Sequence, residues 1–262
     1  MDITNSSGYR DFMWAVNLPR LAFEMVGLWP KHYKCIKKNL WAEIWVAIVI
    51  ISLIFISNIP MICTIIQVWG NMLLVIDNLH TTLPQIIVSV KYVVIRRKRK
   101  VLLSIVNMMA EDWMAFKLDR ERNVMIKRAQ TGRLIMMIGY IIIITGFFTV
   151  NFLSLLDIHV LYVTNYTDRR RLLPLETYHF YNSYKSPQFE LTFFIQILTT
   201  LFAAVIYMSV DIFLVVIVLH ICGQLENFRC RLIDLVLYKD FNKILNDIVT
   251  FHLRLIRYEF LL

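Results

Sequence analysis

The sequence predicts an all-α protein that crosses a membrane several times, and three long apolar stretches carry that prediction. Residues 134–156 contain no Asp, Glu, Lys, Arg or His, and 23 residues are enough to cross a hydrocarbon core about 30 Å thick. Residues 44–76 lack the same residue types, and residues 191–219 contain one charge, Asp211. A soluble core helix has a polar face, and these stretches have none wide enough. The chain has only 7 glycines, which argues against a membrane β-barrel with many tight hairpins.

We expect four spans. The uncharged residues 44–76 are too few for two full crossings, so the second span must extend into charged sequence and take in Asp77, His80 and Lys91. Pro60 predicts a kink near the end of the first span, because proline removes a backbone hydrogen bond. The spans are expected at about residues 41–67, 72–95, 134–156 and 188–222, with a tight turn at 67–71.

The distribution of lysine and arginine predicts how these spans are oriented. Residues 1–40, residues 91–133 and the tail after residue 222 together hold 24 of the 28 basic residues. The loop from 157 to 190 holds the other 4, and the turn between the first two spans holds none. Because basic residues gather on the cytoplasmic side of membrane proteins, we expect an inverted topology with a cytoplasmic N-terminus.

This orientation divides the chain into three parts. Residues 1–40 are expected to form a cytoplasmic N-terminal segment, residues 41–222 a transmembrane bundle, and residues 223–262 a cytoplasmic helical tail. Within the bundle, we expect a cytoplasmic loop at 96–133 and an outer loop at 157–187.

Three local features are interpreted in this frame. Asn165 begins an Asn-Tyr-Thr sequon in the outer loop and is a candidate glycosylation site, whereas the sequon at Asn5 lies on the cytoplasmic side and is interpreted as a chance match. The basic cluster 96–100 ends the second span and is expected to contact anionic membrane lipid. The net charge of +9 is explained by the basic residues that flank the spans on the cytoplasmic side. Nucleic acid is not expected as a partner, because no recognition signature accompanies the charge.

The sequence offers no arrangement of catalytic residues. Asp77, His80 and Asp157 can reach the membrane interface, and Asp211 lies deeper without a paired acid or base at helical spacing. There is no serine–histidine–aspartate pattern, no HExxH and no glycine-rich phosphate loop. The four cysteines are scattered and include no CxxC pair. We therefore expect no enzyme, no metal and no cofactor, although a small four-span transporter or membrane enzyme remains an alternative.

Ten residues in the outer halves of three spans are candidates for an apolar ligand pocket. Apolar walls with a few polar groups are usual for a site that binds a small hydrophobic molecule. Plain packing between helices, or between helices and lipid, would use the same residue types. The candidates are Leu79, Thr82 and Leu83 in the second span, Phe148, Thr149 and Phe152 in the third, and Phe194, Gln196, Ile197 and Leu201 in the fourth.

Four stretches resemble insect odorant receptors and occur in the order found there. LPLETYHFYNSYKSPQFELTFFIQ, residues 173–196, is similar to the second outer loop and the following span of that family. HICGQLENFRCRL, residues 220–232, is similar to the cytoplasmic end of the fourth span. Glu111-Asp112-Trp113 matches another common position, and Leu28-Trp29-Pro30 resembles ant and other hymenopteran members.

This resemblance implies a fold and a function. Members of the family have seven spans with the inverted topology and assemble with a co-receptor subunit as tetrameric cation channels. A small hydrophobic odorant binds between helices in the outer half, and the last span of each subunit lines the pore. The resemblance thus implies an odorant receptor subunit in the plasma membrane of olfactory neuron dendrites. A gustatory receptor-like channel subunit is the alternative within receptors.

The chain ends at Leu262, after the fourth expected span. Judged by the resemblance, we expect a C-terminally truncated receptor that lacks the pore helix. A fragment, a partial gene prediction and a degenerate receptor remain open as explanations.

Overall fold

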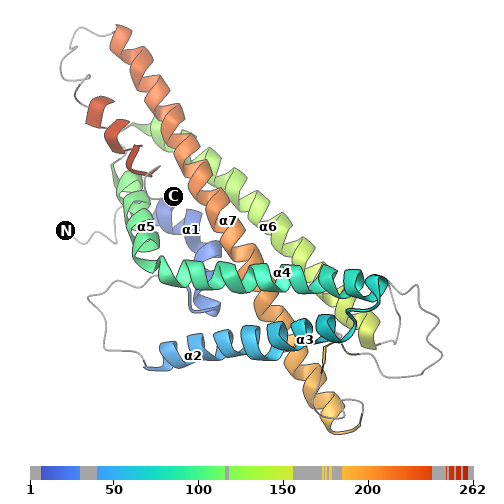
Figure 1. Ribbon diagram of the computed structural model, residues 1–262. Coiled ribbons are helices and arrows are strands. Elements are labelled where there is room, and N and C mark those ends of the chain that lie inside the picture. The colour runs from blue at the N-terminus through green and yellow to red at the C-terminus, as the bar shows by residue number, and fades with distance from the viewer. Residues whose placement is uncertain are drawn as a thin grey trace.

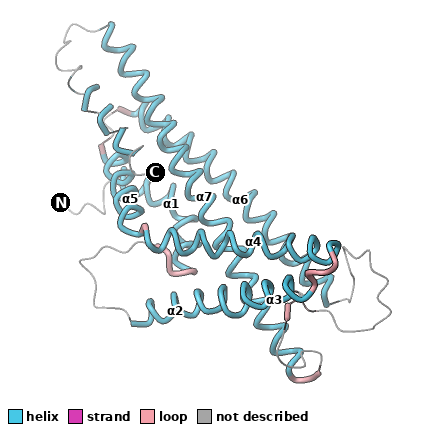
Figure 2. The backbone as a smooth tube through the Cα atoms, in the orientation of Figure 1, coloured by secondary structure: helices cyan, strands magenta, loops and turns pink. Residues whose placement is uncertain are grey.

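The computed structural model describes residues 7–29, 40–115, 118–155, 173, 175, 177–178, 185–237, 246, 248–250, 252–254 and 256–258. In this part of the chain all regular structure is helical, which confirms the all-α expectation (Figures 1 and 2). The elements are α1 (Ser7–Met25), α2 (Leu40–Ile51), the π-helical η3 (Ser52–Asn58), α3 (Ile59–Gln67), α4 (Met72–Arg97), α5 (Arg99–Met114), α6 (Asp119–Leu155) and α7 (Gln188–Leu237).

Four helical stretches among the described residues are long and apolar enough to cross a membrane. They are Leu40–Gln67, Met72–Arg97, Asp119–Thr149 and Gln188–Ile233. The first joins α2, η3 and α3 into one run, and the widened π turn comes directly before Pro60, whose ring nitrogen cannot donate to the helix. Asn71 caps α4 by accepting a 3.2 Å hydrogen bond from the Leu73 N–H.

The helices α6 and α7 are longer than the apolar spans that they contain. The α6 helix begins at Asp119, fifteen residues before the apolar run at 134, because Glu, Arg, Lys, Gln, Met and Ala all favour a helix. Ion pairs also hold this polar part of α6 in place: Arg122 Nε lies 2.6 Å from Asp11, and Arg128 Nη2 lies 2.8 Å from Glu226. Hydropathy detects the apolar part of such a helix and not its charged extension.

The two long helices lie side by side, and α4 crosses α7 (Figure 1). Gly139 on α6 and Gly223 on α7 each leave room for a methionine side chain of the other helix, Met208 and Met125. The N-terminal α1 contacts α5 and α7 and ends at Met25, and Gly27 follows with a φ of 71° that suits glycine. Leu28 N–H then reaches back to the Phe23 carbonyl at 2.8 Å, which completes a helix C-cap.

Candidate functional site

The ten predicted pocket residues all lie at one end of the bundle, where α4 begins, α6 ends and α7 begins (Figure 1). Thr82 and Gln196 are buried and Ile197 is half-buried. The other seven are exposed on this chain: Leu79, Leu83, Phe148, Thr149, Phe152, Phe194 and Leu201. The structure therefore brings the ten to the same end but does not close one cavity from them.

An apolar hollow of about 380 Å³ lies between α6 and α7 at this same end. Its size falls within the range of small-molecule sites, about 300–1,000 Å³. The residues that line it are Ile142, Ile143, Gly146, Phe147, Asn151, Leu175, Thr200 and Ala204. None of the ten predicted residues is among them. On α6 the difference is helical register, because Phe147 and Asn151 face the hollow whereas their neighbours Phe148 and Phe152 point outward.

Asn151 supplies a polar group at the wall of this hollow. The side chain is 8% exposed, and its Nδ2 donates a 2.7 Å hydrogen bond to the Phe147 carbonyl. Within the described part of the chain, its Oδ1 has no hydrogen-bond partner. A buried acceptor without a partner costs about 1–3 kcal/mol, so a ligand that donates a hydrogen bond would gain by meeting it. Thr200 adds no free donor, since its hydroxyl donates to the Gln196 and Ile197 carbonyls.

Gln196 positions Leu175 and Thr177 against α7. Its Oε1 accepts from the Leu175 N–H at 3.1 Å, and its Nε2 donates to the Leu175 carbonyl at 3.1 Å and to Thr177 Oγ1 at 3.0 Å. Thr64 on α3 accepts from the Tyr178 N–H at 2.8 Å. These bonds hold Leu175 over the hollow. Gln196, predicted as a pocket residue, thus acts here by fixing a lining residue rather than by lining the hollow.

Asp211, the deepest charge of the fourth expected span, has a basic partner on another helix. Lys91 Nζ on α4 lies 2.6 Å from Asp211 Oδ1 and 2.8 Å from Oδ2. The same ammonium lies 4.3 Å from the centre of the Tyr207 ring. Either charge left alone in lipid would be costly, so this ion pair favours contact between α4 and α7.

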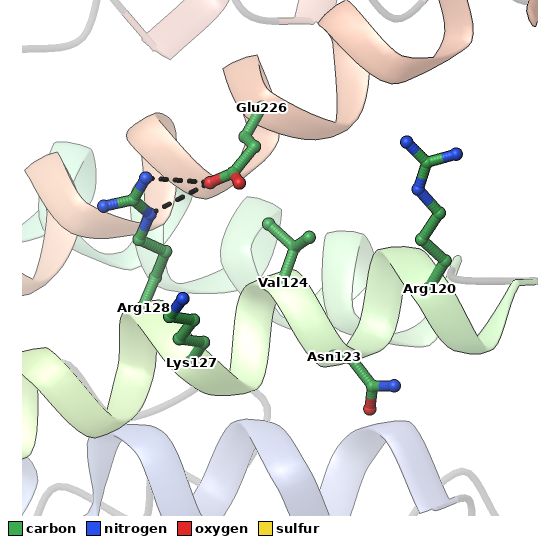
Figure 3. Close-up of a pocket in the computed structure, with 6 residues that line it drawn as sticks. All are labelled: Arg120, Asn123, Val124, Lys127, Arg128 and Glu226. Atoms are coloured by element: carbon green, nitrogen blue, oxygen red, sulfur yellow. Dashed lines mark hydrogen bonds and ion pairs between the residues drawn. The ribbon is translucent and has the colours of Figure 1, made fainter.

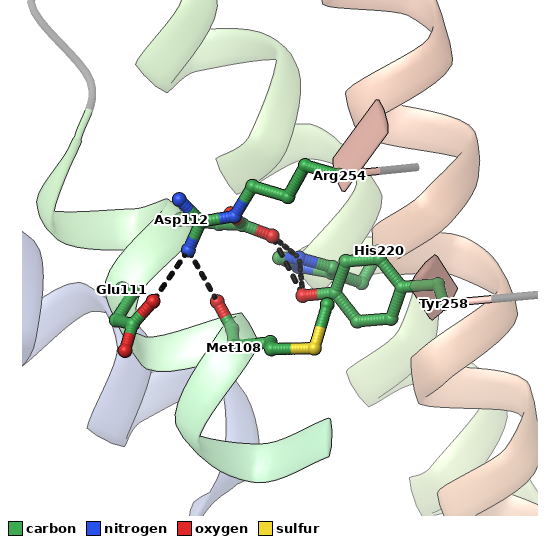
Figure 4. A network of polar contacts seen from close by, with 6 residues as sticks. All are labelled: Met108, Glu111, Asp112, His220, Arg254 and Tyr258. Atoms are coloured by element: carbon green, nitrogen blue, oxygen red, sulfur yellow. Dashed lines mark hydrogen bonds and ion pairs between the residues drawn. The ribbon is translucent and has the colours of Figure 1, made fainter. Parts of the chain in front are cut away.

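A buried polar cluster lies where α5 and α7 meet the C-terminal residues (Figure 4). Asp112 on α5 is 4% exposed, and its Oδ2 accepts from the Tyr258 hydroxyl at 2.6 Å and lies 3.0 Å from His220 Nε2. Its Oδ1 lies 2.6 Å from Arg254 Nε, and Arg254 Nη2 also reaches Glu111 at 2.8 Å. Burial, followed by the charge of Asp112, raises the pKa of Tyr258 well above its ordinary value, so the phenol keeps its proton and donates. We call Asp112, His220, Arg254 and Tyr258 the tail cluster.

The tail cluster joins sequence motifs that lie far apart in the chain. Asp112 belongs to the Glu111-Asp112-Trp113 motif and His220 opens the motif at 220–232, while Arg254 and Tyr258 come from the C-terminal residues. The sequence analysis noted both motifs but did not predict that their residues meet.

A profile of the 7tm Odorant receptor family matches residues 71–259, which is most of the chain. The chain belongs to this family. This is a family of receptors and not of enzymes, and membership favours odorant receptors over the gustatory and transporter alternatives. No curated protein sequence matches the chain.

The fold of this odorant receptor chain is that of a solved insect olfactory receptor. It is similar to olfactory receptor OR5 from Machilis hrabei, with a TM-score of 0.76 and 17% identity. It is also similar to the structure of that receptor in complex with eugenol, with a TM-score of 0.78 and 18% identity. Each match covers 97% of this chain and 65% of the other, so the chain spans about two thirds of the length of these receptors.

Proposed function

We propose that this chain is a ligand-binding part of an odorant receptor, and that a small apolar molecule binds in the hollow between α6 and α7. The observation that carries the proposal is an apolar hollow of ligand size with one buried, unsatisfied acceptor among the described residues, Asn151 Oδ1. Such a site favours an apolar volatile molecule that carries one hydroxyl, phenol or other donor. The olfactory receptor from Machilis hrabei in complex with eugenol supports this class of ligand.

We propose that the hollow faces the outside of the cell and that the N-terminus is cytoplasmic. The α4–α5 junction carries Arg96, Arg97, Lys98, Arg99 and Lys100, and further basic residues lie in the first part of α6. All of them lie toward the end away from the hollow, as the positive-inside rule requires. The candidate glycosylation site Asn165 lies outside the described residues, and we retain it as an outer-loop site.

The exposed predicted residues keep a role in this proposal. Leu79, Leu83, Phe148, Phe152 and Phe194 are exposed apolar residues at the same end of the bundle as the hollow. They can extend the ligand site where another helix covers them, and they contact lipid where none does. Thr82 is buried on α4, where it donates a 2.7 Å hydrogen bond to the Asn78 carbonyl.

We propose that the receptor gates cation flow only as a hetero-tetramer with a co-receptor subunit. The resemblance implies that this assembly lies in the plasma membrane of olfactory neurons. The matched receptors are longer than this chain, and the resemblance places the pore in the last of seven spans. Residues 1–262 are therefore expected to bind odorant but to give no odorant-evoked current when expressed with the co-receptor alone.

The ligand proposal is tested on the chain itself, reconstituted in lipid nanodiscs. The chain is titrated with eugenol and with its methyl ether, in which a methyl group replaces the phenol hydrogen so that no donor remains. The Ala204→Trp variant should fill the hollow and abolish the ligand-induced rise in unfolding temperature. Leu214→Trp, at an exposed position on α7 outside the hollow, is the matched control and should leave the rise unchanged.

The role of Asn151 is tested by Asn151→Leu, which is close in size and has no acceptor. The preference for the phenol over its methyl ether should fall by about fivefold or more, corresponding to about 1 kcal/mol. Equal affinity for the two ligands in the native chain would contradict a role for the acceptor. Undiminished binding to Ala204→Trp would contradict the location of the site.

A further inference from the structure

A second hollow, at the other end of the bundle, lies in a groove between α6 and α7. It measures about 590 Å³. Its lining residues come mainly from the polar part of α6, and they are Arg120, Asn123, Val124, Lys127, Arg128 and Glu226 (Figure 3). We call it the basic groove. It does not overlap the apolar hollow, and the proposed odorant function does not use it.

The basic groove has two cations that its acid does not neutralise. Glu226 on α7 pairs with Arg128, whose Nη2 and Nε lie 2.8 and 3.2 Å from the same carboxylate oxygen. Arg120 contacts the thiol of Cys230 at 3.1 Å and no carboxylate among the described residues. Lys127 likewise forms no ion pair within that part of the chain. Figure 3 shows Arg120 and Lys127 on either side of Val124, with Asn123 pointing away.

The inner end of the groove lies within side-chain reach of the lipid phosphates. Lys127 lies seven residues before Leu134, where the apolar run of α6 begins. At 1.5 Å per residue along the membrane normal, this places the Lys127 backbone about 10 Å outside the hydrocarbon and Arg120 about 10 Å further out. The headgroup layer is about 5–8 Å thick, so the long Lys127 side chain can reach back into it. A simple lipid phosphate would reach only Lys127 and Arg128. A headgroup that carries further phosphates on a ring could also reach Arg120.

We propose that the basic groove binds the polyphosphorylated headgroup of an anionic lipid, of the phosphatidylinositol bisphosphate class. The groove recognises the phosphomonoester groups of the headgroup. Because Lys127 lies close to the membrane, the groove favours a lipid over a free phosphate compound. The site differs from the basic cluster 96–100, whose residues do not line this hollow. The cations that hold the headgroup all come from α6, and the headgroup lies beside the existing Arg128–Glu226 pair.

The test uses the full chain in nanodiscs, with phosphatidylinositol bisphosphate in one set and phosphatidylserine at equal total charge in another. The Arg120→Gln/Lys127→Gln variant should weaken binding of a fluorescent phosphatidylinositol bisphosphate about tenfold or more, since each basic residue near the membrane surface contributes about 1 kcal/mol. Arg10→Gln/Arg257→Gln removes two charges from exposed positions outside both the groove and the basic cluster 96–100, and it should reduce binding less than threefold.

A gain-of-binding variant keeps the test independent of folding defects. Glu226→Gln removes the acid of the groove and frees Arg128, so binding should tighten by about threefold or more. Equal losses in the two double variants, or no gain with Glu226→Gln, would overturn the site. Soluble inositol trisphosphate should compete only weakly; if it bound the detergent-solubilised chain as tightly as the lipid, the preference for a lipid would be overturned.

The lipid test is separable from the proposed odorant function. It uses no odorant, and both faces of a nanodisc are open to the probe, so an incorrect membrane orientation would leave the binding intact.

Discussion

Asp112 gathers three partners on one buried carboxylate, so its charge is the central element of the tail cluster. The Asp112→Asn substitution keeps the shape but leaves Arg254 facing a neutral amide. We expect it to destabilise the chain by about 2 kcal/mol, less than for a fully buried pair because Arg254 is one third exposed. Thermal unfolding in detergent measures this loss.

The matched control for Asp112 is Glu111→Gln. Glu111 contacts the same arginine, but its side chain is 62% exposed. An exposed ion pair contributes little, so the loss should stay below about 0.5 kcal/mol. Equal losses from the two substitutions would show that Asp112 acts only as a surface partner.

Tyr258 makes docking of the C-terminal residues sensitive to alkaline pH. Its pKa in the docked state is raised from the ordinary value of 10.0, so below pH 9 the phenol is protonated whether docked or free. As the pH rises through 10, the free tyrosine loses its proton and the docked one does not, which favours the undocked state. The stability should fall by up to about 1.4 kcal/mol per pH unit above that point.

Denaturant midpoints at pH 9 and pH 11 measure this effect. Tyr258→Phe lowers the stability at both values, because it removes the 2.6 Å hydrogen bond to Asp112, but the fall between them should be smaller than in the native chain. An identical fall in both chains would mean that the other tyrosines account for all of it.

At the scale of elements, the Lys91–Asp211 pair is expected to lock α4 against α7. Lys91→Met and Asp211→Asn should each destabilise the chain, since each leaves a single charge within apolar sequence. The double variant should be more stable than the sum of the two losses predicts, with a coupling of about 1 kcal/mol or more. Thermal unfolding of the four chains in nanodiscs completes the cycle, and strictly additive losses would contradict the lock.

The sequence predicted the helical elements better than the faces they present. Long apolar runs identify membrane helices directly, because lipid requires each backbone group to be bonded within the helix. They did not reveal the polar start of α6, since residues 119–133 are helical through propensity and ion pairs rather than hydropathy. Predicting Phe148 in place of Phe147 missed the hollow by one residue, because register depends on how α6 packs against α7.

Contacts between distant residues were beyond the reach of sequence patterns. Lys91 and Asp211 are 120 positions apart, and nothing in the local spacing of either predicts the other. Asp112 and Tyr258 are 146 apart. A charge in apolar sequence without a local partner was the available signal, since such a charge requires a partner from another helix.

At the scale of the whole molecule, the proposed orientation places the loop after α6 outside the cell. Asn165→Gln should then remove a mass shift that is sensitive to endoglycosidase in insect cells, because only residues on the lumenal side are glycosylated. The control is Asn5→Gln, which removes the sequon on the expected cytoplasmic side of the membrane and should not change the mass. An N-terminal epitope tag should stain only permeabilised cells. Loss of the shift with Asn5→Gln, together with staining of intact cells, would invert the topology and place the basic groove outside.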